Sequence, residues 1–136
     1  MGRLGKTTAE YLAEVEENGL ALRYVPLARR TRTICLAAVR SNGLALQHVP
    51  ANMRSDIVLC LDAVDSAGMA LEFVPEPLRG RELCFDAVHS DGAALQFVPE
   101  ELRDEDMCAE ALESCPKALR DVPLPLRKSF AAAGRA

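Results

Sequence analysis

One block of sequence recurs five times along this chain of 136 residues. "CLDAVDSAGMALEFVPEPLR" begins at Cys60 and "CFDAVHSDGAALQFVPEELR" begins at Cys84, with looser copies on either side. The dipeptide Val-Pro recurs once in each copy, at steps of 24, 25, 24 and 24 residues. We therefore divide the chain into repeats 1–5 and a C-terminal cap or tail, all within a single domain of residues 1–136; the segments are 7–30, 31–54, 55–79, 80–103, 104–127 and 128–136.

Each repeat has the pattern of a long helix followed by a short one. Residues that cap helix N-termini stand at one position of every copy, at Thr7, Thr31, Asp56, Gly80 and Asp104. In the first copy Glu10 completes a capping box with Thr7. Twelve residues after this position the first four copies have a glycine, which predicts a left-handed stop for the first helix after about eleven residues. Proline ends the second helix because it has no N–H to donate.

Helices this short cannot bury their apolar faces alone, so neighbouring copies have to stack. The sequence therefore predicts an all-α fold, a right-handed α-solenoid of five two-helix repeats. The single 25-residue step comes from Ser55, which is inserted in a linker where extra length costs little.

Composition narrows the classes of function. Apolar residues make up 49% of the chain and the mean hydropathy is +0.01, which is typical of a globular protein. The net charge of −4 argues against nucleic acid as a partner. No apolar run approaches the roughly 18 residues of a membrane span, so we expect no membrane association and a cytoplasmic location.

Four of the five cysteines share one position, which invites a metal or redox interpretation: Cys35, Cys60, Cys84 and Cys108. Equivalent positions of stacked helices lie roughly 8–10 Å apart, which is too far for a disulfide. Zinc ligands also come in closely spaced pairs. We therefore predict buried apolar cysteines, no metal and no cofactor, with Cys115 as the most reactive thiol.

Two further columns are candidate partner-binding sites. One consists of five arginines, which either pair with nearby carboxylates such as Asp56, Glu82, Asp104 and Glu105 or present forked donors to an acidic partner or phosphate. The other consists of residues flanking the second helix, which either pack between repeats or line a groove for a partner. The columns are Arg30, Arg54, Arg79, Arg103 and Arg127, and Tyr24, His48, Phe73 and Phe97.

The block "CLDAVDSAGMALEFVPEPLR" and its neighbours resemble a bacterial tandem-repeat family known only as a domain of unknown function. The resemblance covers about residues 7–127. It implies helical arrays in host-associated bacteria and their effectors, and an interaction module without catalytic residues. The chain is also similar to the leucine-rich repeat variant, which alternates an α-helix with a shorter 3₁₀ helix.

These observations favour a non-catalytic module that binds another protein, with a monomer as the expected state. Such a module could belong to a larger scaffold protein or to a bacterial effector delivered to a host cell. Two alternatives remain open: a structural spacer without a ligand of its own, and nucleic-acid or phosphate binding through the arginine column. No residue set has the spacing of a catalytic site, because His48 and His89 fall at different repeat positions.

Overall fold

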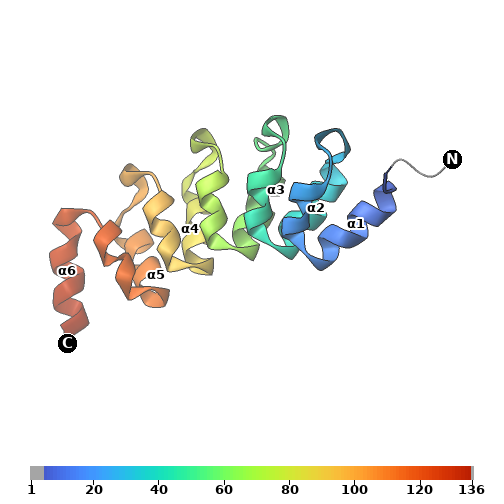
Figure 1. Ribbon diagram of the computed structural model, residues 1–136. Coiled ribbons are helices and arrows are strands. Elements are labelled where there is room, and N and C mark those ends of the chain that lie inside the picture. The colour runs from blue at the N-terminus through green and yellow to red at the C-terminus, as the bar shows by residue number, and fades with distance from the viewer. Residues whose placement is uncertain (1–4, 136) are drawn as a thin grey trace.

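The computed structural model describes residues 5–135, so residues 1–4 and 136 of the predicted domain lie outside the described part. Within residues 5–135 the fold is all-α, with helices and no strand. The α-helices follow one another in a row, with the two ends of the chain at opposite ends of it (Figure 1). They are α1 (Thr8–Glu17), α2 (Arg32–Ser41), α3 (Ile57–Ser66), α4 (Arg81–Ser90), α5 (Glu105–Ser114) and α6 (Leu124–Arg135).

The predicted caps of the first helices are confirmed. Thr7, Thr31, Asp56 and Asp104 each accept a hydrogen bond from a backbone N–H in the first turn of the helix that follows. The capping box is present as well, because Glu10 donates its N–H to Thr7 Oγ1 at 3.2 Å and accepts the Thr7 N–H at 3.1 Å. Gly80 caps α4 with its backbone alone. The helices α1–α5 are ten residues long, one fewer than predicted.

The second helix of each repeat is a 3₁₀ helix. Six residues are too few for several α-type hydrogen bonds, whereas i→i+3 bonds close within one turn. A second 3₁₀ turn fills most of the linkers, so α and 3₁₀ helices alternate, as the likeness to the leucine-rich repeat variant implies. The segments are η1 (Gly19–Tyr24), η2 (Leu27–Arg29), η3 (Gly43–His48), η4 (Ala51–Met53), η5 (Gly68–Phe73), η6 (Glu76–Leu78), η7 (Gly92–Phe97), η8 (Glu100–Leu102) and η9 (Pro116–Asp121).

The glycine column does not supply left-handed helix stops, and that prediction is wrong. No residue in the described part of the chain has a positive φ. Each of these glycines instead begins a 3₁₀ helix against the next repeat. A Cβ on Gly43 would overlap the carbonyl oxygen of Ala63, and Gly19, Gly68 and Gly92 meet the corresponding oxygens in the same way. Glycine is therefore required by close approach of two backbones rather than by its own dihedral angles.

The core runs along the row because each repeat packs against the next. Neighbouring α-helices contact each other on one side, and neighbouring six-residue 3₁₀ helices contact each other on the other side. The buried side chains recur by column, including the cysteines, the alanines of both helices and the Val that precedes each proline. The first repeat breaks the α-helical part of the pattern, with Glu10 and Glu14 where later repeats bury apolar residues.

The C-terminal segment forms a helix that begins before residue 128. Helix α6 starts at Leu124, so it replaces the linker turn that the other repeats have after Val-Pro. Leu126 and Phe130 pack against the core, while Leu124 is 71% exposed.

Candidate functional site

The arginine column binds backbone carbonyls. Arg30 donates from Nε to Val25 O at 2.7 Å and from Nη2 to Arg23 O at 3.2 Å, both in its own repeat. Its Nη1 donates to His48 O of the next repeat at 2.8 Å. Arg79 and Arg103 make the same three bonds. Each of these guanidinium groups thus joins the six-residue 3₁₀ helices of two consecutive repeats.

Two members of the column show where this arrangement depends on the repeat spacing. Arg54 bonds to Val49 O and Gln47 O of its own repeat, at 3.0 and 2.8 Å. Among the described residues it has no third bond to the following repeat, because Ser55 lengthens the linker by one residue. Arg127 likewise bonds to Val122 O and Arg120 O of its own repeat.

The predicted pairing of these arginines with carboxylates is wrong. The 3₁₀ helices leave carbonyl groups that the helix itself does not bond, and the arginines satisfy them. Two of the four carboxylates pair with other cations instead: Asp56 with Arg32 at 2.7 Å, and Asp104 with Arg81. The hydrogen bond from Arg32 lowers the pKa of Asp56.

The two predicted binding columns form one surface, because the carbonyls that Arg30 and Arg79 reach belong to His48 and Phe97. Phe73 and Phe97 are half-buried and pack against the core, which agrees with packing between repeats. Tyr24 is 73% exposed. Burial lowers the pKa of His48, and the positive charges of Arg30, Arg23 and Arg54 lower it further. We call this positively charged side of the molecule the arginine–aromatic surface.

A second set of contacts between repeats involves serines that the sequence analysis did not single out. The last residue of α2, Ser41, accepts the buried N–H of Gly19 on its Oγ at 3.1 Å. Ser66, Ser90 and Ser114 accept from Gly43, Gly68 and Gly92 at 3.0–3.1 Å. A signal exists in the sequence, because repeat 1 has Glu17 at this position and no described repeat before it. The last repeat correspondingly replaces the donor glycine with Pro116.

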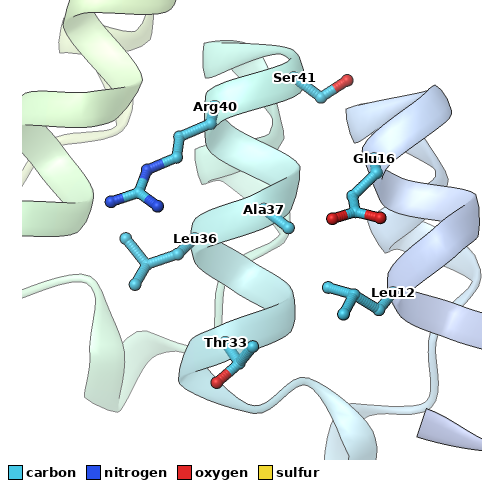
Figure 2. A pocket seen from close by; sticks show the side chains of 7 residues that line it. All are labelled: Leu12, Glu16, Thr33, Leu36, Ala37, Arg40 and Ser41. Carbon is cyan, nitrogen blue, oxygen red and sulfur yellow. The ribbon is translucent and has the colours of Figure 1, made fainter. Parts of the chain in front are cut away.

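The outward side of the α-helices has a row of half-buried apolar side chains, which we call the α-ridge. It consists of Leu12, Leu36, Leu61 and Phe85, one from each of the first four helices. Figure 2 shows the groove between α1 and α2, where Leu12 and Glu16 lie across from Ala37. Its volume is about 480 Å³. Similar shallow grooves flank α4.

One known family shares this repeat pattern. Two segments of the chain, residues 31–79 and 81–127, match the family described as Domain of unknown function (DUF4116). The chain belongs to this family. Each matched segment spans two consecutive repeats, so one DUF4116 unit corresponds to a pair of repeats. No curated protein and no solved structure matches the chain.

Ion pairs link neighbouring α-helices of the DUF4116 repeats across the outward face. Arg40 on α2 meets Asp62 on α3 at 2.8 Å, and His89 on α4 meets Glu110 on α5 at 2.8 Å. The bond to Glu110 raises the pKa of His89, with Asp86 and Glu113 adding to the effect. Burial raises the pKa of Asp65, and the negative charges of Asp86 and Asp62 raise it further. From α3 onward this face is therefore acidic.

The four aligned cysteines of the DUF4116 repeats are fully buried, as predicted. Burial raises the pKa of each thiol to about 11. Cys60 donates to the carbonyl of Arg54 at 3.1 Å, and Cys35 and Cys108 point at the equivalent carbonyls. Within residues 5–135 no three potential ligands gather as a metal site. None of the helices described has the length and apolar character to cross a membrane.

Proposed function

We propose that this chain is a non-catalytic protein-binding module, built as a right-handed α-solenoid of five repeats. The observation that carries the proposal is the α-ridge, a row of half-buried apolar side chains with shallow grooves beside it. A contiguous apolar patch rimmed by polar residues is typical of a surface that binds another protein. The module would act as a monomer, within a larger scaffold or a bacterial effector.

The α-ridge supports this function better than the two columns predicted from sequence. Each of the side chains of Arg30, Arg79 and Arg103 has five guanidinium N–H groups, and three of the five are already bonded to backbone carbonyls. Phe73 and Phe97 of the aromatic column pack against the core. The α-ridge residues also contact the core, yet they border grooves that the chain does not fill.

The structural spacer remains the second candidate. It is favoured by the number of features that serve stacking alone, namely the arginines that bond to carbonyls of two repeats, the serine–glycine hydrogen bonds and the buried cysteines. A spacer needs a rigid row and no exposed binding site. Phosphate binding through the arginine column is a third candidate, and it rests on the guanidinium N–H groups that the backbone does not occupy.

The two main candidates can be separated by comparing baits that differ only on one face. The wild-type chain, a Leu36→Lys/Phe85→Lys variant and a control Tyr24→Lys/Gln47→Lys variant would be used in parallel, after circular dichroism shows equal helicity. Bound proteins would be identified and the binary affinity measured with purified partner. A partner lost only with the Leu36/Phe85 variant supports the α-ridge. Loss only with the control moves the site to the arginine–aromatic surface. No partner for any bait favours the spacer.

A further inference from the structure

The repeat pattern is broken at one place on the outward face, where α3 meets α4. Ile57 and Val58, in the first turn of α3, are 45% and 41% exposed. The helices α1, α2, α4 and α5 each have at least one polar residue at these two positions, and three of them have two: Thr8 and Ala9, Arg32 and Thr33, Arg81 and Glu82, and Glu105 and Asp106. Exposed branched apolar residues add nothing to the stacking of repeats, so packing does not explain them.

A groove lies beside Ile57, between α3 and α4. Leu61, Leu78 and Leu83 form its apolar lining, and Arg81 and Glu82 stand at its rim. Its volume is about 330 Å³, enough for a leucine-sized side chain. Gly80 lies in the same groove, and it is the only helix cap among α1–α5 without a side chain. No atom lies within 4 Å of the position where its Cβ would be, so the glycine leaves the groove open.

The rim of this groove is negatively charged. Arg81 is neutralised by Asp104, with Asp106 at 3.9 Å. Glu82 and Asp86 make no ion pair among the described residues, and they border the adjoining hollow around Phe85. An apolar slot beside two unpaired carboxylates is complementary to an apolar side chain flanked by lysine or arginine.

The shape of the surface selects a helix as the occupant. An extended peptide gains most of its affinity from an unpaired strand edge, and the described residues offer none. A helix satisfies its own backbone and needs only a groove for its apolar face.

We propose that the α3–α4 groove binds a lysine- or arginine-rich amphipathic helix of a partner protein. The helix inserts one apolar side chain among Ile57, Leu61 and Leu78 and places its basic residues against Glu82 and Asp86. This inference rests on the proposed function and names the class of partner. The carboxylates set the sign of charge that is accepted, and the apolar slot sets the register.

The test uses a synthetic amphipathic peptide of roughly 18 residues, long enough to form a helix, with leucines on one face and lysines on the other. A peptide with glutamates in place of the lysines is its matched control. Binding is measured by fluorescence anisotropy at low and high salt with the wild type, Gly80→Leu and Glu82→Lys/Asp86→Lys. Glu72→Lys/Glu101→Lys makes the same charge change elsewhere.

We expect the wild type to bind the lysine peptide and not the glutamate peptide, with an affinity that falls at high salt. Glu82→Lys/Asp86→Lys should weaken binding by at least about tenfold, whereas Glu72→Lys/Glu101→Lys leaves it within about twofold. Gly80→Leu should weaken binding by filling the slot, at unchanged helicity. Chemical shifts should change at α3 and α4.

The proposal is overturned by equal binding of both peptides, by equal binding to all variants, or by no binding at low salt. Self-association of the wild type through this face would also overturn it. If the lysine peptide does not bind but a natural partner is lost with the Leu36→Lys/Phe85→Lys variant, the proposed function stands and the proposed class of partner is wrong. If both experiments fail, the proposed function falls as well.

Discussion

At the start of each of the first four long 3₁₀ helices, a buried glycine faces a carbonyl oxygen of the next repeat and donates its N–H to a serine of that repeat. The glycine column is visible in the sequence, but the sequence pattern suggests a helix stop. A glycine needed for close approach and one needed for positive φ look the same until the neighbouring backbone is known.

Substituting these glycines should therefore be costly. Gly43→Ala places a Cβ against the Ala63 carbonyl, and we expect a loss of about 1–3 kcal/mol, the usual range for overpacking. Gly80→Ser is the control, since its Cβ meets open space and its hydroxyl can cap α4. It should leave stability unchanged or raise it slightly. Urea denaturation measures both, and equal midpoints for the two variants would contradict the close-approach role.

The buried cysteines give the chain a stability that depends on alkaline pH. Their folded pKa of about 11 lies above the ordinary 9.0. Below pH 9 the thiols are protonated in both states. Between pH 9 and 11 the unfolded chain loses protons that the folded chain keeps, so the free energy of unfolding falls as pH rises. Melting temperatures across this interval should drop more steeply for the wild type than for Cys84→Ala. Identical slopes would argue against burial of that thiol.

At the scale of elements, the first helices were predictable together with their caps, whereas the second were predictable only as short helices. Caps act within four residues of sequence, so Thr7 or Asp104 identifies a helix start without knowledge of the fold. The 3₁₀ geometry of the second helices was indicated only by the likeness to the leucine-rich repeat variant, because the residue pattern itself does not distinguish a short α-helix from a 3₁₀ helix. The pairing of the arginines failed for a related reason: carboxylates close in sequence point elsewhere, and the nearest acceptors are carbonyls of another element.

The hydrogen bonds of the arginine column predict a rank order of stability among its Arg→Lys variants. Arg79→Lys should remove most of three hydrogen bonds, because a single ammonium cannot reproduce the guanidinium fork. Arg54→Lys should cost less, since Arg54 bonds only within its own repeat. We expect about 1.5–3 kcal/mol for Arg79, which is the range for bonds to a charged group, and a smaller loss for Arg54.

The exposed Arg23→Lys serves as the control for these substitutions and should stay within about 0.5 kcal/mol of the wild type. Chemical denaturation of the three variants gives the comparison. If Arg79→Lys unfolds at the same denaturant midpoint as the wild type, the arginine column does not hold the repeats together and is instead a free surface.

For the whole molecule, the sequence period was enough to predict an all-α chain of stacked repeats, and the resemblance of the repeated block indicated the family. It was not enough to choose a binding surface. Leu12, Leu36, Leu61 and Phe85 share one apolar repeat position, and nothing in that pattern shows that they are only half-buried. Ile57 and Val58 were visible as apolar residues, but nothing local distinguishes an exposed pair from a buried one.

The central claim is that backbone contacts between repeats hold the row together, and native-state hydrogen exchange tests it directly. The amides of Gly19, Gly43, Gly68 and Gly92 lie outside the α-helices, yet each is buried and bonded to a serine of the next repeat. We predict that they exchange as slowly as the core amide of Val64. Exchange as fast as that of the exposed linker residue Ser55 would show that the repeats do not stack in this way.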